Sequence, residues 1–591
     1  MQLRTLCLTL LATATIAACN SAPQASREAA GPPLRQDVAL EDAASAAEVQ
    51  GLTQSQPQPQ PPPQRSQQNP MHERNAYMPL APPAPMAHLV APASKASPVI
   101  ASPHPDPANT ERYAERSDNP VQRASEQPVS TFSIDVDTGS YSNVRRMLQA
   151  GQRPPADAVR AEEFINYFSY GHTAPSQRTV PFLVTTELAP TPWNPARQLM
   201  MIGIKGYDVP KAVLPPSNLV FLIDTSGSMD SPDKLPLLKQ ALAMLVPQLR
   251  AQDRVSIVVY AGSAGLVLAP TPGDRHEEIL QALERLEAGG STNGGEGIRL
   301  AYAMARQSFI AGGVNRVILA TDGDFNVGTI DQGALETLVA DQRASSVALT
   351  TLGFGQGNYN DAMAERLADI GDGNHAYIDT AQEARKVLVE EMQATLMTIA
   401  RDVKIQVEFN PALVSEYRLI GYENRLLQRE DFANDKVDAG DIGAGHEVTA
   451  LYEITLAGSG ANRLPTLRYG QRRDSSARQA NGDELAHLRL RYKRPDSDTS
   501  KLIETPIMAS SLRTQPSASL RFATAVAAYA DLLRGGRNIG RWSWDDVARA
   551  ASASQGEDRF GLRAEFVRLV ELGRQQVAAS PAAPAVEIAG E

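Results

Sequence analysis

Residues 217–230 read SNLVFLIDTSGSMD, and this stretch decides the fold of the middle of the chain. The run LVFLI is apolar on both faces, which is typical of a strand buried in a parallel sheet. A polar loop follows it, and then the helical pattern DKLPLLKQALAMLVPQL. Apolar strands and amphipathic helices alternate in this way to about residue 400. The pattern predicts an α/β fold, a doubly wound and mostly parallel sheet covered by helices on both faces.

Three loops of this sheet carry oxygen-bearing side chains. Asp224 ends the strand SNLVFLID, and Ser226 and Ser228 follow it. Thr292 lies in GGSTNGGEG, and Asp322 follows the strand VILAT. Ligands of doubly wound sheets bind at the carboxyl ends of the strands, where these loops meet. Two carboxylates and three hydroxyls suit a hard cation, Mg²⁺ or Mn²⁺ rather than a calcium cage. The alternative is that Asp and Ser only cap the helix that follows.

These five residues resemble the metal-ion-dependent adhesion site of von Willebrand factor type A domains. Asp224-Thr225-Ser226-Gly227-Ser228 is similar to its DxSxS motif, Thr292 to its second-loop threonine and Asp322 to its third-loop aspartate. The resemblance implies that Ser226, Ser228 and Thr292 bind the ion directly, while Asp224 and Asp322 act through water. It also implies an open coordination position for an Asp or Glu of a protein ligand, which an under-neutralised ion attracts strongly.

The resemblance extends over residues 129–575. The segments IDVDTGSYSNVRRML, VRAEEFINYF, TLGFGQGNYND and AEFVRLVELG are similar to a family of bacterial lipoproteins. Members of this family place a type A domain between an N-terminal von Willebrand factor-associated region and a C-terminal region of unknown function. The resemblance therefore implies a binding protein, without a defined activity.

The first residues, MQLRTLCLTLLATATIAAC, are typical of a secretory signal. Ile16-Ala17-Ala18-Cys19 resembles a lipobox, in which the peptidase cuts before Cys19 and its sulfur carries a diacylglycerol. The alternative is an ordinary signal peptide. Cys7 lies in the segment that would be removed, so we expect no thiol chemistry in the mature chain. Asn20 favours the outer membrane by the sorting rule of enteric bacteria. We therefore expect a lipid-anchored protein of the bacterial cell envelope.

The composition and the strand pattern divide the chain further. Pro, Gln, Ala and Ser dominate the segment after the signal, which predicts a disordered tether rather than a specific Pro-rich recognition motif. Strands before and after the type A domain predict that it is inserted in a β-sandwich. We predict a signal peptide at 1–18, a tether at 19–128, an N-terminal associated region at 129–214, a type A domain at 215–398, β-sandwich strands at 399–500, a helical region at 501–576 and a loose tail at 577–591.

The stretch IDVDTGSY at residues 134–141 contains Asp-Thr-Gly-Ser, the string of aspartic proteases. A pepsin-like protease needs two such loops, because two carboxylates share a proton, and no second one with apolar flanks is present. The stretch also runs into a basic helix, whereas a retroviral-type protease continues as β-structure. Asp135 and Asp137 lie two apart on a predicted strand. We expect them to cap the helix, to pair with Arg145 or Arg146, or to bind a cation.

The remaining signals argue against an enzyme. A net charge of -11 disfavours a nucleic-acid partner. The sequence has no HExxH, GxSxG or GxxxxGK motif, and no His or Lys base lies near the five positions. We expect an adhesion or scaffold protein that recognises an acidic group through Mg²⁺. The alternatives are a subunit of an envelope assembly that binds mainly through its C-terminal domain, and a hydrolase with the metal as Lewis acid.

Overall fold

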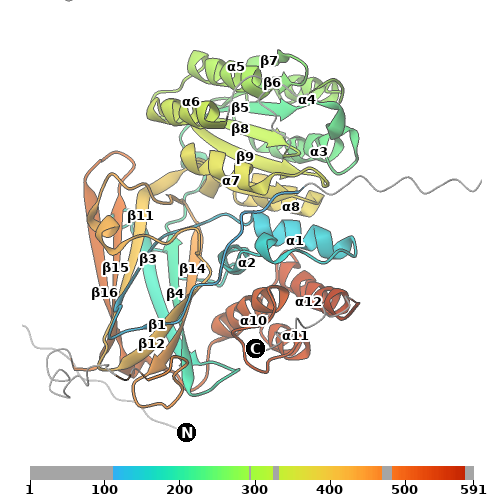
Figure 1. The fold of residues 1–591 in the computed structure, drawn as a ribbon. Helices are drawn as coiled ribbons and strands as arrows, with labels where there is room; N and C mark the ends of the chain where they lie inside the picture. The colour runs from blue at the N-terminus through green and yellow to red at the C-terminus, as the bar shows by residue number, and fades with distance from the viewer. Residues whose placement is uncertain (1–110, 292–293, 324–331, 467, 469–481, 580–591) are drawn as a thin grey trace, which may run out of the picture. The chain divides into compact units, whose positions relative to one another are not determined.

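The computed structural model describes residues 111–291, 294–323, 332–466, 468 and 482–579 (Figure 1). The predictions for the signal peptide, for Cys19, for most of the tether, for Thr292 and for the last residues of the tail concern positions outside this description. Within the described ranges, no helix has both the length and the apolar character that a membrane span requires.

A six-stranded sheet forms the middle of the chain, in the order β10-β9-β8-β5-β6-β7 (Figure 1). All neighbouring strands in it are parallel except β6 and β7. The strands are β5 (Ser217–Asp224), β6 (Arg254–Tyr260), β7 (Ala264–Pro272), β8 (Val314–Thr321), β9 (Ala348–Phe354) and β10 (His375–Ile378). The helices are α3 (Leu235–Leu245), α4 (His276–Glu284), α5 (Gly294–Gln307), α6 (Gln332–Ala344), α7 (Asp361–Ile370), α8 (Ala381–Arg385) and α9 (Met392–Leu396), with a π-helical turn at Lys386–Glu390 between the last two.

Strand β5 divides its side chains between two hydrophobic cores. Leu219, Phe221 and Ile223 pack in the core that α3, α4 and α8 complete. Val220 and Leu222 pack in the core that α5, α6 and α7 complete. Successive side chains of a strand point to opposite faces, so both faces of this central strand are covered. This arrangement confirms the predicted doubly wound sheet.

The strands outside this sheet form two further sheets. One has the order β1-β12-β14-β4-β3 and the other the order β13-β11-β15-β16, with β2 paired to β11. Strand β4 pairs with β14, and β2 with β11, so strands from before the type A domain pair with strands from after it. The predicted insertion is therefore confirmed. The strands are β1 (Gln122–Arg123), β2 (Val129–Ser133), β3 (Phe182–Pro190), β4 (Arg197–Gly206), β11 (Thr398–Phe409), β12 (Val414–Ile420), β13 (Ile442–Gly443), β14 (Glu447–Leu456), β15 (Glu484–Lys493) and β16 (Ser500–Met508).

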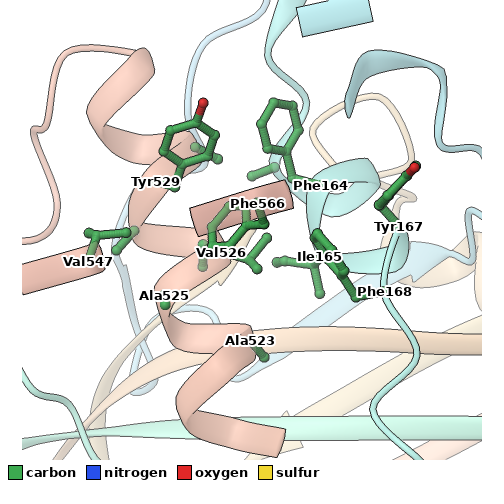
Figure 2. Packing of buried hydrophobic residues seen from close by; sticks show 14 of the residues in the cluster. Phe164, Ile165, Tyr167, Phe168, Ala523, Ala525, Val526, Tyr529, Val547 and Phe566 are labelled. Carbon is green, nitrogen blue, oxygen red and sulfur yellow. The ribbon is translucent and has the colours of Figure 1, made fainter. Parts of the chain in front are cut away.

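Helices from the two ends of the described chain share one core. They are α1 (Gly139–Gln149), α2 (Ala161–Asn166), α10 (Ala518–Leu533), α11 (Trp544–Ser552) and α12 (Leu562–Ala579). Figure 2 shows Phe164 and Phe168 of the N-terminal region beside Tyr529 and Phe566 of the C-terminal helices. The Phe168 and Phe566 ring centroids lie 5.5 Å apart in an edge-to-face contact, a favoured geometry for aromatic rings. The C-terminal helices are thus packed against the N-terminal region.

The folded chain begins earlier than the predicted end of the tether at residue 128. Strand β1 pairs with β12, and Ala124 beside it is fully buried. Asn119 is buried and its amide donates hydrogen bonds to the carbonyl oxygens of Leu419 (3.3 Å) and Gly421 (2.7 Å). Residues 111–128 are attached mainly by polar and backbone groups. The predicted end of the tether rests on the scarcity of apolar residues, and polar and backbone contacts of this kind do not change that composition.

The predicted start of the helical region at residue 501 is also wrong. Residues 500–508 form β16, which pairs antiparallel with β15, and the first helix of this region, α10, begins at Ala518. Strand β16 lies at the edge of its sheet, and most of its side chains are at least partly exposed. Pro506 within it is compatible with an edge strand, which has a free hydrogen-bonding side. The sequence of this strand therefore lacks the alternation of apolar and polar residues by which strands are predicted.

Candidate metal site

Two predicted site residues meet at the carboxyl edge of the six-stranded sheet. Asp224 is the last residue of β5, and Asp322 follows the last residue of β8. The two strands are adjacent and parallel, with Ile223 opposite Ala320, so they end side by side. The Thr321 hydroxyl donates to Asp224 Oδ2 at 3.4 Å. Strand register therefore brings together two carboxylates that lie almost a hundred residues apart.

The loop after β5 arranges the two serine hydroxyls around the Asp224 carboxylate. Asp224 is fully buried, and its Oδ1 accepts a hydrogen bond from the Ser226 backbone N–H at 2.8 Å. Ser226 Oγ and Ser228 Oγ lie 3.0 Å apart. Ser226 is buried, whereas Ser228 is exposed. The hydroxyl pair thus connects a buried carboxylate to the surface of the protein.

The second predicted loop approaches the first. The Gly227 backbone N–H donates to the Gly290 carbonyl oxygen at 3.1 Å, and the Gly289 N–H donates to the Thr225 carbonyl oxygen at 2.8 Å. These bonds hold residues 289 and 290 against the Asp224 loop. Thr292 itself lies outside the described residues. Its role as a further metal-binding hydroxyl stays a prediction.

The oxygen donors present fit a hard divalent cation. Burial raises the pKa of Asp224 to about 6, and the nearby Asp322 carboxylate adds to this, while hydrogen bonds from Ser226 offset part of the effect. A cation beside these carboxylates would favour their ionised form. The described donors are carboxylate and hydroxyl oxygens, which suit Mg²⁺ or Mn²⁺ better than a soft metal. The alternative, that Asp and Ser only cap the helix that follows, has less support, because Ser226 at the start of the 3-10 helix Gly227–Asp230 makes no side-chain capping hydrogen bond.

A lysine that the sequence analysis did not expect lies against this site. Lys234 is buried, and its Nζ lies 2.8 Å from Asp322 Oδ2 and 3.3 Å from Asn358 Oδ1. Lys234 stands at the start of α3, in the same connection as Asp224, and its long side chain reaches back to the sheet edge. The statement that no lysine lies near the five positions is therefore wrong. The sequence feature that could have identified this lysine is its position directly before the helix, six residues after Ser228.

The two aspartates of the stretch that contains Asp-Thr-Gly-Ser are buried and lie in ion pairs. Strand β2 ends at Ser133, so Asp135 and Asp137 lie in the loop before α1 and not on a strand as predicted. Both contact Arg425, at 3.0 Å and 3.6 Å, and neither pairs with Arg145 or Arg146 in the described ion pairs. The Asp137 carboxylate also accepts the His375 backbone N–H. Arg425 is nearly 290 residues away in sequence, so local patterns could not identify it.

Asp135 also belongs to a buried acidic group with Glu163 and Glu365. One oxygen of each lies within 4.8 Å of the others. Arginines surround this group: Arg425 pairs with Asp135, and Arg160 pairs with Glu163. The Glu163 carboxylate also accepts the Ser140 backbone N–H at 2.8 Å. The Arg425–Asp135 pair joins the N-terminal region to the chain after β12, and these ion pairs account for the acidic group without a ligand.

Three family models match consecutive parts of the chain. They are described as von Willebrand factor (residues 107–201), von Willebrand factor type A domain (residues 218–394) and uncharacterized protein YfbK, C-terminal (residues 394–575). Domains of the second kind commonly bind a divalent metal and take part in protein–protein interaction or adhesion. The order of the three matched segments along the chain agrees with the insertion of the six-stranded sheet between the flanking strands.

Similar proteins include two uncharacterized bacterial proteins and one solved structure. "Uncharacterized protein sll0103" of Synechocystis is 26% identical over 298 residues, 49% of this chain and 65% of its own. A solved von Willebrand factor type A protein from Catenulispora acidiphila is 15% identical, with a TM-score of 0.38 over 67% of this chain and 91% of that one. "Uncharacterized protein YfbK" of Escherichia coli is 49% identical over 469 residues, 78% of this chain and 81% of its own. The chain therefore belongs to the YfbK family of proteins with a von Willebrand factor type A domain.

Proposed function

We propose that this protein is a lipid-anchored binding or scaffold protein of the bacterial cell envelope, and not an enzyme. In this proposal the type A domain recognises an Asp or Glu of a protein partner through a bound Mg²⁺ or Mn²⁺. The anchor would be Cys19, in the outer membrane. The observation that carries the proposal is the convergence of Asp224, Ser226, Ser228 and Asp322 at the carboxyl edge of the sheet.

The chemistry of these residues supports recognition rather than turnover. Asp224, Ser226, Ser228 and Asp322, with Thr292 as a further hydroxyl, would hold the ion. The bound ion would supply a positive centre for a carboxylate of the partner. Lys234 lies beside the site, and its amino group is engaged in an ion pair with Asp322 rather than presented to a substrate as a general base. These contacts favour the binding function over the hydrolase alternative.

The alternative of a subunit that binds mainly through its C-terminal helices has less support. In α10, 11 of the 16 residues are buried, and the helix packs against α2, α11 and α12. Its apolar surface is therefore largely used within the protein. The described residues therefore give no specific reason to place the main binding surface on this helix.

Capture of envelope proteins tests the proposed function. We expect immobilised wild-type protein to retain a partner in Mg²⁺ and to release it in EDTA, because the partner carboxylate binds through the ion. Ser228→Ala removes one exposed hydroxyl of the site and is expected to reduce capture at least about tenfold, the loss of one good polar contact. Bound partners would be quantified by mass spectrometry.

The matched control is Ser459→Ala, which removes the hydroxyl of another exposed serine, in the β-sandwich region. It should capture as the wild type does. Capture that persists in EDTA and in Ser228→Ala would argue against a metal-dependent contact and would favour the alternative through the C-terminal helices.

A further inference from the structure

The Lys234 side chain is built into the fold of the metal site. Its residue is 6% exposed, and its Nζ donates to Asp322 Oδ2 at 2.8 Å and to Asn358 Oδ1 at 3.3 Å. The backbone is fixed as well, since the Lys234 carbonyl oxygen accepts the Leu238 N–H at 2.8 Å in the first turn of α3. Lysines are rarely buried unless their charge is paired, so a buried ammonium group with two oxygen partners differs from an ordinary surface lysine.

The loop after β9 passes close to the aliphatic part of this side chain. Gly355 has a φ of +72°, and a Cβ added to it would lie 2.3 Å from both Cγ and Cε of Lys234. Any larger residue at position 355 would therefore collide with the lysine. The Oδ1 atom of Asn358, in the same loop, accepts a hydrogen bond from the Lys234 ammonium group. Two features of one loop thus accommodate the lysine, one by its missing side chain and one by its amide oxygen.

The charge of Lys234 acts against the ion that the site is proposed to bind. The two buried carboxylates, Asp224 and Asp322, carry a formal charge of -2 when ionised, and the Lys234 ammonium reduces the sum to -1. A divalent cation has less to gain there, because like charges repel strongly where water is scarce. With the ion bound, the same group would have a net charge of +1, which favours a carboxylate from outside.

We propose that Lys234 is a resident counter-ion of the metal site, which compensates Asp322 in the absence of metal and weakens the binding of a divalent cation. This inference rests on the proposed function and adds its regulation. The metal then binds weakly alone and more tightly together with an acidic partner, because the partner's carboxylate compensates the extra positive charge. Lys234 is a positioning residue in this account, and not a ligand of the metal.

Titration calorimetry of Mg²⁺ with Lys234→Met tests the inference. Methionine is unbranched and can replace the aliphatic part of Lys234 beside Gly355. We expect the dissociation constant for Mg²⁺ to fall about tenfold or more, because the opposing charge is gone. In EDTA, the variant is expected to melt several degrees below the wild type, since Asp322 has lost its counter-ion, and excess Mg²⁺ should restore more of its stability than it adds to the wild type.

Two further variants make the test specific. Lys234→Gln removes the charge but keeps a hydrogen-bond donor for Asp322, so it should also bind Mg²⁺ more tightly while losing less stability. Lys239→Met is the matched control: this lysine lies on the same helix but donates to the carbonyl oxygens of Glu284 and Leu286. Its Mg²⁺ affinity should equal that of the wild type.

The outcomes separate this inference from the proposed function. If the wild type binds Mg²⁺ and both Lys234 variants bind no more tightly, Lys234 is not a counter-ion and the metal site stands. If only the Lys234 variants bind Mg²⁺, the inference is supported, and the wild type does not hold Mg²⁺ without a partner. If no variant binds Mg²⁺ or Mn²⁺, both proposals fail. A Lys239→Met affinity that changes as much as that of Lys234→Met would also overturn the inference.

Discussion

Replacement of Arg145 by methionine is expected to lower the free energy of unfolding by about 3–5 kcal/mol, the range for removing one partner of a buried ion pair. The Arg145 side chain is 1% exposed. Its guanidinium donates to both oxygens of Asp379 (2.7 and 2.5 Å), to Glu383 (2.7 Å) and to Glu565 (3.0 Å). Methionine would fill much of the same space, but it would leave these carboxylates buried without their cation.

The arginine joins three parts of the chain. It lies on α1, Asp379 follows β10, Glu383 lies on α8 and Glu565 lies on α12. Burial alone would lower the pKa of Arg145, but Tyr167, Asp379 and Glu383 reverse this and hold that pKa well above its ordinary value. The cation therefore persists at every pH at which the protein is folded. Its loss should weaken the attachment of the type A domain to both flanking regions.

Urea denaturation, followed by circular dichroism, measures this effect. Arg153→Met serves as the control, because Arg153 is an exposed arginine shortly after the same helix, and it should change stability by no more than about 0.5 kcal/mol. A loss below about 1 kcal/mol for Arg145→Met would show that this ion-pair group does not hold the parts together.

Truncation of Phe566 to alanine is expected to cost a similar amount, about 3–5 kcal/mol, as for other large aromatic residues in a core. Phe566 is fully buried on α12. Its ring centroid lies 5.5 Å from those of Phe168 and Phe522 and 5.2 Å from that of Tyr529. The deletion would leave a cavity between helices from both ends of the described chain, which cannot close without moving several rings.

Phe560→Ala offers a matched comparison, because it removes the same atoms six residues earlier. Phe560 is 40% exposed, and its described ring contact is with the guanidinium of Arg559. Its loss should cost less than about 1 kcal/mol. Equal costs for the two variants, again from urea denaturation, would mean that α12 is not part of a shared core.

The sequence was sufficient to predict the six-stranded sheet and the place of the two site aspartates. Strands that are apolar on both faces occur in parallel sheets, and parallel neighbours end at the same edge. Asp224 and Asp322 could therefore be expected at the same edge of the sheet, and the structure shows that their strands, β5 and β8, are also neighbours. The insertion of this sheet between paired strands could be predicted too, because apolar strands stand on both sides of it.

Other features depend on long-range polar contacts, which leave no periodic pattern. Lys234 reaches Asp322 across 88 residues, and Arg425 reaches Asp135 across 290. The chain from residue 111 to 128 is held by groups such as Asn119, with no run of apolar residues. In each case the sequence contains the charged or polar residue, but its partner is set by the tertiary structure.

Calorimetry of Mg²⁺ binding to the wild type beside Asp224→Ala tests the central claim most directly. Asp224 is the buried carboxylate that orients the Ser226 backbone through Oδ1, so its removal takes away both a charge and the loop geometry. We expect the wild type to bind one divalent ion, with Mn²⁺ as an alternative to Mg²⁺, and the variant to bind none. Equal heats for the two proteins, or no binding of either ion by both the wild type and Lys234→Met, would contradict a metal-dependent site at the edge of this sheet.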